Sequence, residues 1–294
     1  MNPAPARYLC LGFLLLALAG CAGPGAGAAP DAAPQTTITN VGSDTLVNLA
    51  LAWAEAYEGA HPQVNLSVTG GGSGTGLAAL INGTVDIANA SRQIKDDEKK
   101  AAQANGIEPT EFIVARDAIA VIVNPSNPVS QLSLPQLSEI YSGQLTNWAQ
   151  LGGDDRPIVL LSRETNSGTH VYFLENVLRL GQKDNQTLFS PDTLLMPSSE
   201  GISAEVRQNP NAVGYDGLGY VTPDMKTVAV ARADGGPYVL PTIATVNDKS
   251  YPIARDLYMY TRGRPEGAVK DYLDWILGPE AQAIVAQLGF VPVP

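Results

Sequence analysis

The stretch Ser162-Arg163-Glu164-Thr165-Asn166-Ser167-Gly168-Thr169 joins a predicted strand to a predicted helix. The apolar run at residues 158–161 has the pattern of a buried strand, and residues 170–178 have the spacing of an amphipathic helix. The first backbone N–H groups of a helix have no partner within the helix and carry partial positive charge. The layout therefore favours an anion held where the helix begins.

The side chains of this stretch suit an anion as well. Ser167 and Thr169 offer hydroxyl donors, and Gly168 lets a ligand approach the backbone closely. Arg163 adds a planar fork of N–H donors. The same residues also fit a simpler arrangement, in which Ser or Thr caps the helix and the arginine is solvated. Taken alone, the stretch leaves both interpretations open.

Residues 1–20 are predicted to be a signal peptide that is removed. Arg7 precedes an apolar run at residues 8–19, which is too short for a permanent membrane-spanning helix. The run ends in Leu18-Ala19-Gly20-Cys21, which resembles the lipobox of bacterial lipoproteins. In those proteins the signal is cut before the cysteine, which is then lipidated. We therefore expect a lipid on Cys21, the alternative being an ordinary signal peptide with a chance cysteine.

The two cysteines of the chain, Cys10 and Cys21, both lie near its start. The first falls in the predicted signal peptide and the second would carry lipid. The mature domain would then have no disulfide, no cysteine metal site and no cysteine nucleophile. Residues 21–35 are rich in Ala, Gly and Pro, which predicts a flexible tether.

The composition predicts a globular part that can form substantial cores, because 45% of the residues are hydrophobic and only 16% are charged. Its length is enough for two domains of modest size. The net charge of −11 argues against nucleic-acid binding. It does not argue against an anionic ligand, because a buried oxyanion is held by local donors and dipoles.

The globular part alternates predicted strands with predicted helices, so we expect an α/β fold. Three early strands each end in a small polar loop. In a parallel sheet such loops share one edge, where ligands bind. The predicted strands cover residues 37–42, 64–69, 85–90, 118–125, 158–161, 213–215, 226–230 and 257–261. The predicted helices cover residues 46–59, 77–82, 96–104, 132–141, 170–178, 201–208, 266–277 and 279–288.

Four loops that follow predicted strands combine small donors, arginines and one acid. One enclosed tetrahedral oxyanion explains them better than four independent helix caps. The candidate binding residues are Ser43, Asp44, Thr45, Ser73, Gly74, Arg92, Arg163, Ser167, Gly168 and Thr169.

The glycine-rich loop at residues 70–76 has a second interpretation, a nucleotide-binding loop. Residues 74–79 fit the pattern G-x-G-x-x-A. However, the predicted helix after them is short, and the next strand ends in Ser91-Arg92 rather than in an acid that would hold a ribose. A Walker lysine is also missing. A flexible turn explains these glycines equally well.

Taken together, these motifs resemble the phosphate-binding lipoprotein family (PstS family) of the bacterial ABC-type phosphate importer. The resemblance covers essentially the whole mature chain in order, and the Arg-x-x-x-Ser-Gly-Thr element is quite specific. The matching motifs are Gly42-Ser43-Asp44-Thr45, the glycine loop, Asp86-Ile87-Ala88-Asn89-Ala90-Ser91-Arg92, Tyr141-Ser142-Gly143, Thr146-Asn147-Trp148, the Arg163 to Thr169 stretch and Ala212-Val213-Gly214-Tyr215.

The resemblance implies a type II periplasmic-binding-protein fold, with two α/β lobes joined by two crossing strands. Lobe 1 would comprise residues 36–122 plus 251–294, and lobe 2 residues 123–250. The crossings would lie near residues 121–124 and 251–261. Phosphate would sit between the lobes. The loops after the first three strands would contribute from lobe 1, and Arg163 with residues 167–169 from lobe 2.

The resemblance also implies a binding protein rather than an enzyme. It would be lipid-anchored outside the cytoplasm, in the periplasm or on the outer face of the cell membrane. As a monomer without cofactor or metal, it would capture inorganic phosphate and deliver it to an ABC permease. One alternative is the same fold with sulfate, molybdate or tungstate. A secreted phosphatase is a weaker one, because the sequence has no G-x-S-x-G elbow and no His/Asp metal cluster.

One position departs from the pattern of many family members, which have an aspartate where Arg92 stands. That acid accepts the proton of bound phosphate and so rejects sulfate, which has no proton to give. Asp44 occupies a position where relatives often have Ser or Thr, and we expect it to take over the acceptor role. The alternative is that Asp44 caps the helix at 46–59 and that Arg92 pairs with Asp44 or Asp86, outside the ligand shell.

Overall fold

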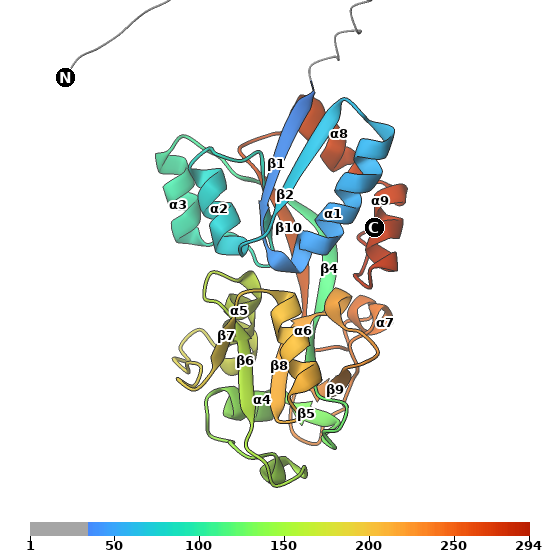
Figure 1. Cartoon of the computed structure of the whole chain (residues 1–294). Helices are drawn as coiled ribbons and strands as arrows, with labels where there is room; N and C mark the ends of the chain where they lie inside the picture. The colour runs from blue at the N-terminus through green and yellow to red at the C-terminus, as the bar shows by residue number, and fades with distance from the viewer. Residues whose placement is uncertain (1–34) are drawn as a thin grey trace, which may run out of the picture. The chain divides into compact units, whose positions relative to one another are not determined.

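The computed structural model describes residues 35–294, in which strands alternate with helices and the strands form a ten-stranded sheet (Figure 1). The predicted signal peptide and the lipidation at Cys21 lie outside the described residues. The strands are β1 (Thr36–Gly42), β2 (Val64–Thr69), β3 (Ile87–Ala90), β4 (Thr110–Val123), β5 (Gln131–Ser133), β6 (Val159–Arg163), β7 (Leu194–Met196), β8 (Ala212–Gly217), β9 (Lys226–Ala231) and β10 (Ala254–Thr261).

Most helices lie where the apolar spacing predicts them. The helices are α1 (Asp44–Ala60), α2 (Ser73–Ile81), α3 (Asp96–Ala104), α4 (Leu134–Tyr141), α5 (Gly168–Phe173), α6 (Ser199–Gln208), α7 (Ile243–Asn247), α8 (Gly267–Ile276) and α9 (Pro279–Gln287). A π-helical turn, Leu174–Leu178, continues α5, so the predicted helix at 170–178 is confirmed as a helical segment.

The strand order is β2-β1-β3-β10-β4-β8-β6-β7, with β9 paired to both β4 and β5. β1 is parallel to β2 and to β3. β6 is likewise parallel to β7 and to β8. β10 and β4 lie antiparallel to each other between these two groups. Because β1, β2 and β3 are parallel, the polar loops that follow them meet at one edge, as the sequence predicts.

β4 links the two groups of strands, because it changes its partner along its length. It pairs with β10 up to Ala118 and with β8 from Ile119 onward. Figure 1 shows β4 running from the part that contains β1 toward the part that contains β8. The sequence predicted only its buried apolar half, residues 118–125. The start was wrong because residues 110–113 alternate between half-buried and exposed positions and do not form a continuous apolar run.

Two other predicted boundaries were wrong. The segment predicted as one helix at 132–141 begins as β5, and α4 starts at Leu134 after an N-cap on Ser133. α2 starts at Ser73 rather than at 77, so part of the glycine-rich loop is helical. Gly76 allows this helix to lie close to β1, since a Cβ atom there would be 2.6 Å from Gly42 Cα.

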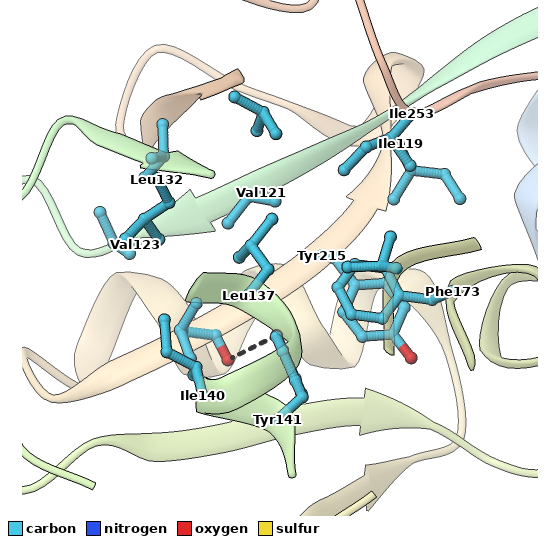
Figure 2. Packing of buried hydrophobic residues seen from close by; sticks show 14 of the residues in the cluster. Ile119, Val121, Val123, Leu132, Leu137, Ile140, Tyr141, Phe173, Tyr215 and Ile253 are labelled. Atoms are coloured by element: carbon cyan, nitrogen blue, oxygen red, sulfur yellow. Dashed lines mark hydrogen bonds between the residues drawn. The ribbon is translucent and has the colours of Figure 1, made fainter. Parts of the chain in front are cut away.

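Separate apolar clusters form on the two groups of strands. One packs α1, α8 and α9 against β1 and β3 and includes Trp53, Ile87 and Tyr272. Another packs α4 and α5 against β4 and β8. Figure 2 shows Val121 and Val123 on β4 facing the α4 side chains, and the Phe173 ring against Tyr215. These two rings are stacked with centroids 3.7 Å apart.

Within residues 35–294, none of the helices has the length and apolar character needed to cross a membrane.

Candidate anion-binding site

Asp44 and Arg163, which lie far apart in the sequence, are in contact at the edge of the sheet where the loops after β1, β2, β3 and β6 meet. We call this edge the loop edge. Asp44 is the first residue of α1, directly after β1, and Arg163 is the last residue of β6. Asp44 Oδ2 accepts a hydrogen bond from Arg163 Nη2 at 2.7 Å. Its Oδ1 accepts one from the Gly71 N–H at 3.1 Å. Asp44 therefore links the loop after β2 to the end of β6, and it does not act as the N-cap residue, which is Ser43.

Arg163 is held almost completely out of solvent, with 1% of its surface exposed. Besides Asp44, it donates from Nη1 to Ser199 Oγ at 3.0 Å and from Nη2 to the Pro197 carbonyl at 2.9 Å. Nε donates to the Met196 carbonyl at 3.3 Å. These bonds fix the guanidinium plane at the loop edge. The alternative interpretation of the sequence, in which Arg163 is solvated, is therefore wrong.

Hydroxyl groups from the loops after β1, β2, β3 and β6 form close pairs at the loop edge. Thr45 Oγ1 and Thr169 Oγ1 are 2.9 Å apart, and both side chains are buried. Ser73 Oγ lies 3.3 Å from Ser91 Oγ and accepts a hydrogen bond from the Ser91 N–H at 3.0 Å. Small buried hydroxyls that bond mainly to one another can turn their protons toward an inserted anion.

The stretch from Ser167 to Thr169 begins α5, as predicted. Ser167 is the N-cap residue, and its Oγ accepts from the Thr169 N–H at 3.2 Å. Gly168 touches the opposite loops, since a Cβ atom there would overlap Ser73 Oγ and lie 2.6 Å from Ser91 Oγ. The Gly74 N–H donates to the Asn166 carbonyl at 2.9 Å. Ser167 is thus a helix cap, as one of the two interpretations of the sequence proposed. The loop around it also packs against the loops after β2 and β3.

Two predicted site residues take less part in this cluster. Ser43 is buried, and its N–H donates to the Asn89 carbonyl at 2.9 Å, but its side chain does not cap α1. The Arg92 side chain pairs with Glu98 of α3. Its Nη1 and Nη2 donate to the two carboxylate oxygens of Glu98 at 2.8 and 2.6 Å. Arg92 therefore pairs with neither Asp44 nor Asp86, the two partners considered from the sequence.

Sequence reasoning missed a second buried arginine, Arg255 on β10. Its Nη2 lies 3.0 Å from Thr169 Oγ1 and 3.3 Å from Thr45 Oγ1. It forms a buried ion pair with Asp117 of β4, with Nη2 2.9 Å from Oδ2. An arginine and an aspartate just before two of the predicted strands were the available signal, but their pairing depends on strand register.

The electrostatics of the cluster combine two buried guanidinium groups with nearby carboxyl groups. Asp44 and Asp117 each pair directly with one of the arginines. Asp216 on β8 is fully buried, and its Oδ2 has no hydrogen-bond partner among the described residues. This burial raises the pKa of the Asp216 carboxyl to about 7, while the charge of Arg163 opposes the rise.

The donors that converge at the site suit an oxyanion. Within residues 35–294, no group of three or more His, Cys, Asp or Glu side chains is placed to hold a metal ion. The donors that converge are guanidinium, hydroxyl and backbone N–H groups, which recognise oxyanion oxygens.

Comparisons with known proteins agree with this geometry. A family model described as the PBP superfamily domain matches residues 27–280. The phosphate-binding protein PstS of Pseudomonas aeruginosa is 34% identical, over 87% of this chain and 83% of that protein. PstS of Bacillus subtilis is 31% identical, over 87% of this chain and 81% of that protein.

Solved structures resemble this one along most of its length. A Clostridium perfringens protein crystallised with bound phosphate has a TM-score of 0.78 and 32% identity, covering 88% of this chain and 100% of that chain. An ABC-type phosphate transport receptor from Vibrio cholerae has a TM-score of 0.69 and 29% identity, with 87% and 100% covered. These matches confirm the predicted type II periplasmic-binding-protein fold. The chain therefore belongs to the PstS family of phosphate-binding proteins, within the PBP superfamily.

Proposed function

We propose that this protein captures inorganic phosphate outside the cytoplasm and delivers it to an ABC-type permease, without changing the phosphate chemically. The observation that supports this most is that the start of α1 meets the end of β6 and the start of α5, through the contact of Asp44 with Arg163 and the buried contact of Thr45 with Thr169. A dianion of tetrahedral shape matches such a set of donors. Membership of a family of phosphate-binding proteins points the same way.

The residues proposed to contact phosphate come from two sides of the cluster. Arg163, Ser167, Gly168 and Thr169 would bind it from the end of β6 and the start of α5. The loops after β1, β2 and β3 would supply Ser43, Asp44, Thr45, Ser73 and Gly74. Arg92 is the least favoured of the proposed residues, because Glu98 occupies both of its terminal nitrogens.

Closure of two lobes over the ligand would bury phosphate. The proposed lobes are residues 36–122 plus 251–294, and residues 123–250. Contacts such as Asp44 to Arg163 and Gly74 to Asn166 connect the two proposed lobes. A ligand that touches both sides favours the closed arrangement by its differential affinity for it.

Asp44 is the proposed proton acceptor that would distinguish phosphate from sulfate. One carboxylate oxygen accepts from Arg163 and the other from the Gly71 N–H, so the group is held in place. A carboxylate oxygen has a further lone pair with which it accepts the proton of monohydrogen phosphate. A sulfate oxygen at the same place would repel it.

Titration calorimetry on residues 35–294, dialysed free of ligand, tests the proposed function. Phosphate, sulfate and molybdate are titrated separately. We expect one-to-one binding of phosphate and at least about a hundredfold weaker binding of sulfate, since a buried lone pair facing sulfate is left unpaired. Binding of sulfate or molybdate without phosphate would support the alternative of another oxyanion, and binding of none would refute the proposal.

Lipid attachment at Cys21 is proposed to hold the protein at the membrane as a monomer, after removal of residues 1–20. The support is the Leu18-Ala19-Gly20-Cys21 sequence at the end of the apolar run. In a bacterial host, the full-length protein should incorporate labelled palmitate and sediment with membranes. Cys21→Ser should abolish the label, and a label that persists would contradict the assignment.

A further inference from the structure

Arg255 lies at the junction of the two groups of strands. It stands opposite Asp117 in the antiparallel pairing of β10 with β4. The side chains of Arg255 and Asp117 are 2% and 0% exposed. Arg255 Nε and Nη2 donate to Asp117 Oδ2 at 3.3 and 2.9 Å. This ion pair fixes the plane of the guanidinium group, because two donors share one carboxylate.

The remaining donors of Arg255 point at the loop edge. Nη1 donates to the Ser91 carbonyl at 3.0 Å. Nη2 donates to Thr169 Oγ1 at 3.0 Å and, at the longer distance of 3.3 Å, to Thr45 Oγ1. One buried side chain thus contacts the loop after β3, the start of α1 and the start of α5.

These contacts decide which way the threonine protons point. A hydroxyl has one proton to donate and two lone pairs with which to accept. The two Nη2 hydrogens are shared among Asp117 Oδ2, Thr169 Oγ1 and Thr45 Oγ1. Because a guanidinium group has no acceptor, neither threonine proton can point back at it. One threonine proton is used between the two hydroxyls, which are 2.9 Å apart. The other proton is available to an acceptor that enters from the opposite side.

We propose that Arg255 is a positioning residue for the anion site, which makes the hydroxyls of Thr45 and Thr169 donate toward the bound oxyanion. The inference rests on the proposed function. It assigns the buried Arg255–Asp117 pair a role in ligand recognition, in addition to joining β4 to β10. Arg92 offers a contrast, since its guanidinium group is paired with Glu98 and donates otherwise to the Gln93 carbonyl.

A double-mutant cycle between Arg255 and Thr169 tests this role. Phosphate affinity is measured by calorimetry for residues 35–294 as wild type, Arg255→Lys, Thr169→Val and the double variant. Lysine keeps the charge but cannot span Asp117 and both hydroxyls, so Arg255→Lys should weaken binding by about tenfold or more. In the Thr169→Val background the same change should weaken binding at least about threefold less, because one oriented hydroxyl is already gone.

The matched control is Arg262→Lys, just after β10, where the arginine is 44% exposed and paired with Asp86. This change should leave the affinity within about twofold of the wild type. An equal loss from Arg255→Lys in both backgrounds would overturn the inference, since Arg255 would then act independently of the Thr169 hydroxyl. An unchanged affinity in Arg255→Lys would also overturn it. A wild-type protein that binds no phosphate would instead refute the proposed function, and the inference with it.

A second variant keeps the test valid if Arg255→Lys fails to fold. The paired replacement Asp117→Leu with Arg255→Met removes both buried charges together, which proteins often tolerate. Its melting temperature reports folding independently of the ligand. We expect a folded protein whose phosphate affinity is at least about tenfold weaker. A folded paired variant with wild-type affinity would overturn the inference.

Discussion

Asp216 illustrates at the residue scale how burial alone changes the chemistry of a side chain. It lies on β8 with no exposed surface, and its Oδ2 has no hydrogen-bond partner among residues 35–294. Because burial raises the pKa of Asp216 to about 7, the folded protein binds a proton where the unfolded chain, with a pKa of about 4, does not. Stability from this group is therefore fully present below about pH 4 and is lost progressively as the pH rises to about 7.

The variant Asp216→Asn should remove this pH dependence. We expect the free energy of unfolding of the wild type to fall between about pH 4 and pH 7, with a slope approaching about 1.4 kcal/mol per pH unit. The variant should give a flatter profile and be the more stable protein at pH 8. Urea unfolding in phosphate-free buffers measures both profiles. The exposed carboxylate change Asp154→Asn serves as control, and a variant profile as steep as the wild type would contradict the account.

Asp44 is the residue expected to set the selectivity for phosphate over sulfate. Replacing it by Asn keeps the shape but supplies an N–H₂ group that can donate to sulfate. We expect Asp44→Asn to reduce the ratio of phosphate to sulfate affinity by at least about tenfold. The ratio is the readout because loss of the charge beside Arg163 strengthens binding of both anions. Calorimetric competition measures it, with Asp184→Asn as control, and an unchanged ratio would rule out Asp44 as the proton acceptor.

The residues of the site were only partly predictable from the sequence. The placement of Arg163 and Thr169 at this edge of the sheet could be predicted, because Arg163 ends an apolar strand and Thr169 lies at the start of a helix. The partner of Arg92 could not, because Glu98 is one of several acids near it and only the path of the chain before α3 selects it. Arg255 and Asp117 required the antiparallel register of β10 with β4, which no local pattern contains.

At the scale of elements, the approach of α5 to α2 sets the width of the site. Gly168 lies where a Cβ atom would overlap Ser73 Oγ. We expect Gly168→Ala to push α5 away and to weaken phosphate binding by about tenfold, because overpacking typically costs 1–3 kcal/mol. The melting temperature of the ligand-free protein should change little, since the loops can separate.

The control for Gly168→Ala is Gly59→Ala in α1, where an added Cβ atom meets nothing within 4 Å. Calorimetry and thermal unfolding of both variants complete the comparison. Equal phosphate affinities in Gly168→Ala and the wild type would mean that the start of α5 does not close against the Ser73 loop.

The order of strands and helices was predictable because most elements carry a clear apolar period. α3 and β2 were predicted with the bounds they have. β7 and α7 were missed, since three and five residues are too short to establish a period. The first half of β4 was missed because its pairing with β10, rather than its own apolar content, holds it in the sheet.

At the scale of the whole molecule, enclosure of phosphate requires hinge motion between the proposed lobes. Asn48 Nδ2 donates to Glu200 Oε1 at 3.3 Å, a further contact between them besides Asp44 to Arg163. We expect small-angle scattering of residues 35–294 to give a smaller radius of gyration with saturating phosphate than without it. Arg163→Gln, which should not bind phosphate, should show no decrease. A wild-type radius that is unchanged by bound phosphate would contradict closure by the ligand.

A crystal structure of residues 35–294 grown with phosphate would show directly whether the anion binds in the cluster at the loop edge. The account predicts one phosphate ion in the buried cluster, with oxygens within hydrogen-bond distance of Arg163, the Thr45 and Thr169 hydroxyls and the Gly168 N–H. Asp44 should lie against the protonated oxygen. A phosphate bound elsewhere, or a cluster that stays empty in crystals saturated with phosphate, would contradict the account.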